Sequence, residues 1–190
     1  MLALMKTCAR ILNSAVASVL LAGAALAQAA PDDGGLNDLF DTLKTAPPEL
    51  ADAIEEQIWE EWSQSGSAAM DVLLERGRDA LRDGDVAAAI EHFSALVDWA
   101  PDFAEAWNGR ATAYFQADLY GPAMFDIREV LRLNPRHFGA MSGLALILEE
   151  TEHDEEALQV WRKVVLIHPH ADGAEDAIRR LAAAVEGTDI

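Results

Sequence analysis

The chain has 190 residues, with 33 acidic and 14 basic side chains that give a net charge of −19 at pH 7. Such a charge repels nucleic acid and anionic lipid and favours basic or neutral binding partners. The alternative interpretation is that the acidic surface only keeps the protein soluble. The one cysteine, Cys8, lies in a segment that we expect to be removed, which excludes disulfides, thiolate metal sites and cysteine nucleophiles from the mature protein.

Residues 1–27 have the organisation of a secretory signal peptide. A charged beginning precedes an apolar stretch, Ile11 to Leu26, and Ala25 and Ala27 stand at the spacing that signal peptidase recognises. A bilayer span needs about 20 apolar residues and this stretch has roughly 16, which favours cleavage over a retained anchor. We therefore expect cleavage after Ala27 or Ala29.

The expected mature chain carries no stable membrane anchor. No cysteine follows the cleavage sites, so the lipid of a bacterial lipoprotein has no acceptor. Removal of residues 1–27 takes away Lys6 and Arg10 and no acid, which makes the net charge two units more negative. We predict a protein in the periplasm of a Gram-negative bacterium, with secretion as the alternative.

Residues 28–35 are interpreted as a flexible junction and 36–69 as an N-terminal helical segment. Two apolar stripes at helical spacing predict helices on either side of Pro47-Pro48. The first stripe consists of Leu36, Leu39, Phe40 and Leu43, and the second of Ala51, Ile54, Ile58 and Trp62 with Trp59 beside it. The segment Leu36–Trp62 is predicted either to cap the first of the repeats described next or to dock a partner or a second copy of the chain.

A period of 34 residues runs through 70–171, and Pro101, Pro135 and Pro169 mark it. Sliding the chain by this period aligns small residues with small ones and large apolar residues with one another. The small columns are Gly77, Ala111, Ala145 and Ala89, Ala123, Ala157, and one large column is Phe93, Ile127, Trp161. Each period is interpreted as two antiparallel helices that cross where side chains are small, with proline ending the second helix.

Three helix pairs follow from this period: 71–82 with 86–99, 102–117 with a partner that has Pro122 in its first turn, and 137–150 with 154–167. Asp102 is predicted to cap the helix that it precedes. Residues 172–190 are predicted to form a capping helix, 172–185, and a tail, with Ile178 and Leu181 on the apolar stripe of the helix.

These columns resemble the tetratricopeptide-repeat (TPR) family. Its signature is a tryptophan, a small residue, a tyrosine, an alanine, an aromatic residue and a closing proline at this period. The unit 104–137 matches best, with Trp107, Ala111, Tyr114, Ala123 and Pro135, whereas 70–103 and 138–171 keep only part of the signature. The resemblance implies an all-α fold, an α-solenoid of three helix hairpins with N-terminal helices and a C-terminal capping helix.

No constellation of residues predicts catalysis, a cofactor or a metal site. His168 and His170 flank Pro169 in a turn, where two ring nitrogens would not converge, and no third ligand stands nearby in the sequence. Neighbouring acids such as Glu155 and Glu156 diverge on a helix, and no glycine-rich phosphate loop or nucleophile elbow is present. We therefore expect a binding protein that is not an enzyme.

The resemblance also implies a groove that binds a peptide, formed by the first helix of each repeat. The residues at the inner columns are Leu74, Arg78, Leu81, Arg82, Asn108, Thr112, Phe115, Gln116, Ser142, Leu146 and Glu149. This floor is predicted to be apolar at its centre, basic at the first repeat and acidic at the third. Leu74 and Gly143 replace polar residues of the clamp by which related proteins hold a terminal carboxylate, so that ligand is not expected.

Phe115 is predicted to be an exposed aromatic anchor of this groove, because Trp107 and Tyr114 already fill the stripe between the paired helices. Its ligand would be a peptide from a partner, or else the chain's own Leu36–Ala46 segment folded back. The sequence as a whole predicts a scaffold or adaptor for envelope proteins or their assembly factors. The alternative is a structural module that self-associates through Leu36–Trp62 and has no groove ligand.

Overall fold

The structure is a computed structural model that describes residues 33–187, all of which belong to one compact unit. The predicted signal peptide, its cleavage sites and most of the 28–35 junction lie outside the described residues. Nine helices occur within 33–187. They are α1 (Asp33–Thr45), α2 (Pro48–Trp62), α3 (Ala68–Arg82), α4 (Val86–Trp99), α5 (Ala104–Gln116), α6 (Tyr120–Leu133), α7 (Phe138–Glu150), α8 (Asp154–Ile167) and α9 (Ala174–Gly187).

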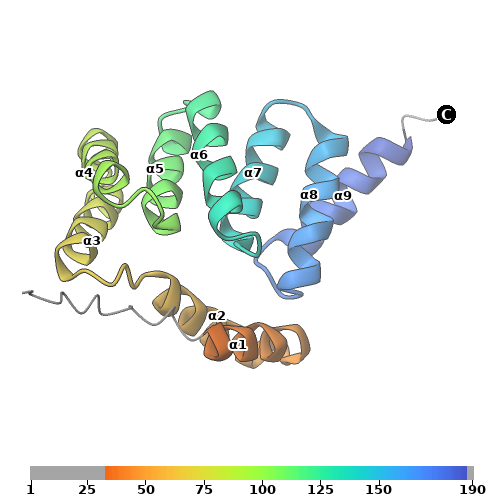
Figure 1. Ribbon diagram of the computed structural model, residues 1–190. Coiled ribbons are helices and arrows are strands. Elements are labelled where there is room, and N and C mark those ends of the chain that lie inside the picture. Colours follow the sequence, from red (N-terminus) through yellow and green to blue (C-terminus); the bar gives the residue numbers. More distant parts are fainter. Residues whose placement is uncertain (1–32, 188–190) are drawn as a thin grey trace, which may run out of the picture. The chain divides into compact units, whose positions relative to one another are not determined.

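The helices α3 to α8 form three successive antiparallel pairs, and α9 packs against α8 (Figure 1). We call α3–α4, α5–α6 and α7–α8 the first, second and third repeat. The predicted all-helical fold with three hairpins is confirmed, and the predicted small residues lie buried where the helices cross. Side chains of this size let two helix backbones approach closely enough for the large columns to fill the space between them.

The turn inside each repeat follows a shared rule. Gly84, Asp118 and Glu152 are 34 residues apart, and all three have a left-handed backbone, with φ of 76°, 58° and 59°. A positive φ lets the chain end the first helix of the pair and reverse within a few residues. The 34-residue period is therefore visible in the backbone conformation as well as in the core.

Four helix starts differ from the prediction by more than one residue. The helix α3 begins at Ala68, three residues before the predicted start at Asp71. Residues 33–35 were expected in a flexible junction but form the first turn of α1. The helix α5 begins at Ala104, and Asp102 does not cap it. Residues 101–102 instead form a turn that the Phe103 amide closes on the Ala100 carbonyl, at 3.0 Å. The last helix begins at Ala174, two residues later than expected.

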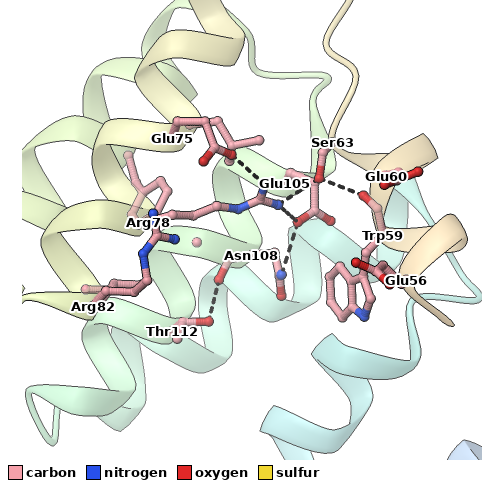
Figure 2. Close-up of a pocket in the computed structure, with 14 residues that line it drawn as sticks. Glu56, Trp59, Glu60, Ser63, Glu75, Arg78, Arg82, Glu105, Asn108 and Thr112 are labelled. Atoms are coloured by element: carbon pink, nitrogen blue, oxygen red, sulfur yellow. Dashed lines mark hydrogen bonds and ion pairs between the residues drawn. The ribbon is translucent and has the colours of Figure 1, made fainter. Parts of the chain in front are cut away.

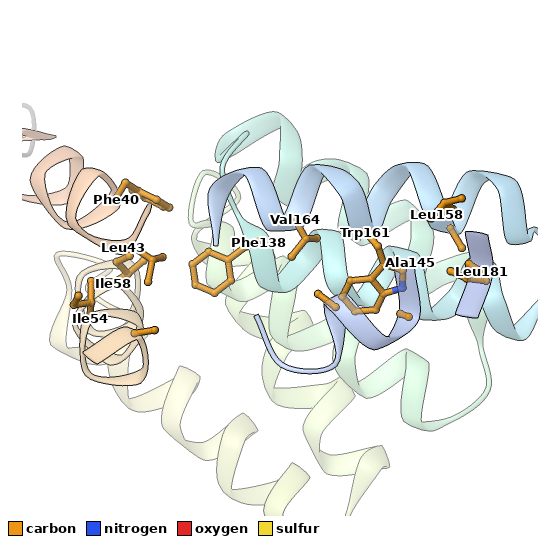
Figure 3. Close-up of a cluster of buried hydrophobic side chains, with 14 residues drawn as sticks. Phe40, Leu43, Ile54, Ile58, Phe138, Ala145, Leu158, Trp161, Val164 and Leu181 are labelled. Atoms are coloured by element: carbon orange, nitrogen blue, oxygen red, sulfur yellow. The ribbon is translucent and has the colours of Figure 1, made fainter. Parts of the chain in front are cut away.

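The N-terminal pair, α1–α2, packs its apolar side chains against the third repeat. A cap on the first repeat, one of the two predictions, is therefore wrong. Phe40 and Leu43 of α1 share a buried cluster with Phe138 at the start of α7 (Figure 3). Further along, the same cluster takes in α8 and α9, through side chains such as Trp161 and Leu181. The predicted apolar stripe of α2 is buried. It is buried against α7, α8 and α9, which lie far from α2 in the sequence.

Polar contacts fasten α1–α2 to the same place. Glu55 of α2 lies 2.9 Å from the ring nitrogen Nε2 of His168, and Ala46 accepts a hydrogen bond from His170. Trp62 stacks on His137, with ring centroids 4.3 Å apart. Thus the two histidines around Pro169 hold the N-terminal pair. Within residues 33–187, no helix is both long enough and apolar enough to cross a lipid bilayer.

Candidate partner-binding site

A buried glutamate, Glu105, links all three repeats. It stands in the first turn of α5 and is only 2% exposed. Its Oε1 atom lies 2.7 Å from Nε2 of His137, which precedes α7, while its Oε2 atom accepts from Arg78 of α3 and Asn108 of α5, each at 3.4 Å (Figure 2). A buried carboxylate needs such partners, because burial without them would carry a large desolvation cost.

His137 has two fixed roles in this network. Its Nδ1 atom accepts the backbone N–H of Ala140 at 3.0 Å and so caps α7. Since Nδ1 is the acceptor, the ring proton lies on Nε2 and is donated to Glu105. One residue thereby fixes the start of the third repeat relative to the second.

Arg78 extends the network to the N-terminal segment. Its guanidinium donates to the Ser63 hydroxyl, 2.8 Å away at the end of α2, and to Glu75 at 2.9 Å. With Glu105 as the third acceptor, the positive charge of Arg78 is already neutralised within the chain. The network therefore joins α2, α3, α5 and α7.

Above this network lies a hollow of about 630 Å³, which we call the first hollow. One wall belongs to α2 and the other to α3 and α5 (Figure 2), and the buried Phe93 of α4 also lines the hollow. Its lining residues are Glu56, Trp59, Glu60, Ser63, Leu74, Glu75, Arg78, Leu81, Arg82, Phe93, Glu105, Asn108, Gly109 and Thr112. The combination of an aromatic and aliphatic base with a charged rim suits a peptide better than a small apolar molecule.

A second hollow, of about 220 Å³, lies between α5 and α7 and is mostly apolar. Its lining residues are Asn108, Ala111, Thr112, Phe115, Ile127, Gly139, Ala140, Ser142, Gly143, Leu146 and Ile147. Asn108 and Thr112 line both hollows. An extended ligand that passes along α5 could therefore contact both.

The structure brings most of the predicted groove residues to these two hollows. The first contains Leu74, Arg78, Leu81, Arg82, Asn108 and Thr112, and the second contains Asn108, Thr112, Phe115, Ser142 and Leu146. Leu74 is only 1% exposed, so it closes the base and offers little surface to a ligand. Gln116 and Glu149 line neither hollow.

Phe115 is half-buried, which is less exposed than the sequence suggested, and it lines the second hollow, so its role as an anchor stays a prediction. Its ring lies 5.8 Å from that of Tyr120, and it packs against the core between the second and third repeats. The chain's own Leu36–Ala46 segment does not fold back onto Phe115, because it packs in another cluster, with Trp62 and Phe138.

The charge pattern of the hollows also differs from the expected one. Arg78 is neutralised as described, and Arg82 pairs with Asp79, so both guanidinium groups that line the first hollow already have an acidic partner. Glu149 accepts a hydrogen bond from the Trp161 indole at 2.6 Å and pairs with Arg180 of α9. Its carboxylate thus ties α7 to α8 and α9, away from the predicted acidic end of the groove.

Sequence reasoning missed the wall that α2 supplies, with Glu56, Trp59, Glu60 and Ser63. The position of Trp59 beside the apolar stripe of α2 could have indicated this wall. An aromatic side chain next to a buried stripe indicates that the helix contacts a second surface as well. Glu105 was missed as well, since nothing in its local sequence shows that it is buried.

Both histidines of the His168-Pro169-His170 segment contact the N-terminal pair. Within residues 33–187, no three His, Cys, Asp or Glu side chains are gathered in a way that could hold a metal ion. The hydrogen bond from His168 lowers the pKa of Glu55 below its ordinary value; burial opposes this, and the Trp59 indole adds to it.

No model of a known protein family matches the sequence. Over 153 residues the chain is 36% identical to a TPR repeat-containing protein of Rhizobium etli, which covers 80% of this chain and 75% of that protein. Over 130 residues it is 26% identical to the small glutamine-rich tetratricopeptide repeat-containing protein 2 of Saccharomyces cerevisiae, covering 68% of this chain but only 37% of that protein.

Solved structures with similar folds include several TPR domains. The first TPR of Spaghetti (RPAP3), bound to the HSP90 peptide SRMEEVD, has a TM-score of 0.59 and 24% identity, and the match covers 62% of this chain and 93% of that one. The Sgt2 TPR domain from Aspergillus fumigatus has a TM-score of 0.60 and 18% identity, covering 65% and 83%. The structure named MamA AMB-1 has a TM-score of 0.54 and 20% identity, covering 79% and 80%. At these identities the likeness shows the fold alone.

Proposed function

The chain belongs to the TPR proteins, and on this premise we propose that it is an adaptor that binds a peptide segment of another protein in its two hollows. The observation that carries the proposal is the first hollow, about 630 Å³ of space with an apolar base and a polar rim. The TPR of Spaghetti, which shares the fold, binds a peptide. The chemistry of the site is that of recognition, since the buried charged groups of the hollow, Glu105 and its partners, neutralise one another.

The proposal includes a place of action. The signal-like residues 1–27 support export, and we infer that the adaptor works in the periplasm on envelope proteins or their assembly factors. Intact-mass measurement on the protein from its native cells should give a mature N-terminus at Gln28 or Ala30. A mass that includes Met1 would contradict export with cleavage.

Site-specific photo-crosslinking tests the adaptor function. Thr112 is exposed and lines both hollows, so a photo-reactive amino acid at this position should give a discrete crosslinked partner in cells. Gln159, which is exposed on α8 and lines neither hollow, provides the matched control. Mass spectrometry should identify the Thr112 adduct and find none at Gln159. The same adducts at both positions would show that the hollows are not the binding site.

The alternative function, self-association through Leu36–Trp62, is less well supported. The apolar stripe that would serve it is already buried against α7, α8 and α9 of the same chain. Self-association would require that stripe to leave its own third repeat. Light scattering over a hundredfold range of concentration should therefore give a constant, monomeric mass, and a mass that rises with concentration would favour the alternative.

A further inference from the structure

The first hollow carries more unneutralised acid than base. Its lining holds four carboxylates, on Glu56, Glu60, Glu75 and Glu105, against two guanidinium groups, on Arg78 and Arg82. Both guanidinium groups are already paired within the chain, as are Glu75 and Glu105. Glu56 and Glu60 are exposed on α2, and neither forms an ion pair with any residue that the structure describes. The charge left for a ligand is therefore negative.

The same wall offers apolar surface. Trp59 projects from α2 beside Glu56 and Glu60, opposite Arg78 and Arg82 (Figure 2). Its indole N–H donates to Glu55 at 2.9 Å, which fixes the ring, and Leu81 is half-buried on the facing helix. A ligand that satisfies both features carries positive charge next to an apolar side chain.

This wall is also the part of α2 that is held on the third repeat. The far edge of the Trp59 indole lies so close to Gly139 of α7 that a Cβ there would be 2.6 Å from the ring. Trp62 and Glu55 hold the other faces of α2, on His137 and His168. A ligand in the first hollow would thus touch α2 and the first two repeats together.

From these observations we propose that the first hollow binds a basic peptide segment with an apolar side chain, and that this binding and the docking of α1–α2 on the third repeat stabilise each other. The inference rests on the proposed adaptor function and narrows its partner to a lysine- or arginine-bearing segment. The two effects are reciprocal by thermodynamic linkage. If the ligand binds only when α1–α2 is docked, bound ligand raises the docking equilibrium by the same factor by which docking raises the ligand affinity.

Calorimetric titration tests the charge preference. The probe is a synthetic peptide, acetyl-Lys-Gly-Lys-Leu-Leu-Lys-Gly-Lys-amide, and its counterparts carry glutamate in place of lysine or serine in place of leucine. The lysine–leucine peptide should bind the mature protein, and both counterparts should bind at least tenfold more weakly. Equal binding of the glutamate peptide would overturn the assignment.

Two charge-matched double variants locate the site. Glu56→Gln with Glu60→Gln should lower the affinity for the lysine peptide about threefold to tenfold, as expected for the loss of two exposed ion pairs. This loss of affinity should be smaller at high salt. Glu91→Gln with Glu156→Gln removes the same charge from exposed helix positions outside the hollow and should change the affinity by less than twofold. An equal loss in both variants would mean that only the overall charge attracts the peptide.

Two glycines test the linkage. An alanine at Gly139 of α7 would collide with Trp59, whereas an alanine at Gly121 of α6 would meet nothing within 4 Å. Gly139→Ala should weaken peptide binding although Gly139 does not line the first hollow, and Gly121→Ala, which changes a position outside both hollows, should not. Bound peptide should also slow amide hydrogen exchange in residues 36–62 of the unaltered protein.

The contrary results are distinct. Faster exchange in 36–62 on peptide addition would show that the ligand displaces α2, and equal affinities of the two glycine variants would show that docking is irrelevant. If Thr112 crosslinks a partner but no lysine peptide binds, the adaptor function stands and the basic-segment inference is overturned. If Thr112 crosslinks nothing, the adaptor function itself fails.

Discussion

The Phe93 ring is held between two glycines of neighbouring repeats. A Cβ at Gly77 would lie 2.5 Å from the ring, and one at Gly109 would lie 2.4 Å from it. Phe93 is fully buried, so the ring has no free space into which it could turn. The close approach of α3, α4 and α5, and with it the base of the first hollow, depends on these two missing side chains.

Gly77→Ala should therefore destabilise the protein by about 1–3 kcal/mol, because overpacking at a buried ring outweighs the better helix propensity of alanine. Gly121→Ala is the control, since a Cβ at Gly121 would meet nothing within 4 Å. Urea denaturation followed by circular dichroism measures both. A Gly77→Ala protein as stable as the Gly121→Ala protein would contradict the assigned packing.

The repeated left-handed turn gives a second prediction at the level of single residues. Glu152 has the φ of 59° that Gly84 adopts at the matching position without steric cost. Glu152→Gly should raise the unfolding free energy by about 0.5–1 kcal/mol, and Gly84→Ala should lower it by about 1 kcal/mol. Thermal melts of the two variants should move in opposite directions.

At the level of elements, α2 determines how the N-terminal pair attaches to the repeats. Its apolar stripe faces α7 and α8, its polar residues Glu56 and Glu60 line the first hollow, and Glu55 lies between these two surfaces against His168. One helix thus contributes to the core, to the hollow and to an ionisable contact across 113 residues of sequence.

The Glu55 contact predicts a pH dependence of docking. The pKa of Glu55 is lowered from its ordinary 4.5, chiefly by the hydrogen bond from His168. A lowered carboxyl pKa contributes stability that is present above the unfolded value and is lost as the pH falls through the folded value. Amide exchange in 36–62 should therefore accelerate relative to 120–133 as the pH falls below about 4.5. Glu55→Gln should remove most of this acceleration, and an unchanged pH profile in that variant would assign it to other carboxyls.

For the molecule as a whole, the cluster around Trp161 joins both ends of the described chain. Trp161 is 4% exposed and belongs to a buried cluster that draws side chains from α1, α2, α7, α8 and α9. Solenoids usually bury surface only between neighbouring repeats, so their ends open independently. Contact between the N-terminal pair and the third repeat should instead make the unit unfold in one step.

Trp161→Ala should cost about 3–5 kcal/mol, through the cavity that it leaves and the lost indole hydrogen bond to Glu149. The whole unit should melt earlier in a single transition that includes α1–α2. Trp99→Ala is the control, because Trp99 is 76% exposed and its loss should change stability by less than about 0.5 kcal/mol. Two separate transitions in the Trp161→Ala protein would show that the N-terminal pair is a separate folding unit.

The sequence by itself determined the repeat architecture, because that architecture rests on short-range rules. The 34-residue spacing of Pro101, Pro135 and Pro169 and the small columns at Gly77 and Ala89 predicted three hairpins with most helix ends within two residues. Helix propensity, turn residues and the closeness of paired helices all act over one period of sequence, so they can be read from it.

Only the tertiary structure decided where the N-terminal pair lies. It thereby also decided which residues line the first hollow. The stripe of Ala51, Ile54 and Ile58 shows that one face of α2 is buried, but apolar surface is non-directional and does not specify its partner. The same holds for charge: whether Arg78 is free for a ligand or neutralised by Glu105 depends on side chains brought together from 27 residues away. Periodicity identifies buried faces, whereas the pairing of those faces follows from the packing of the complete unit.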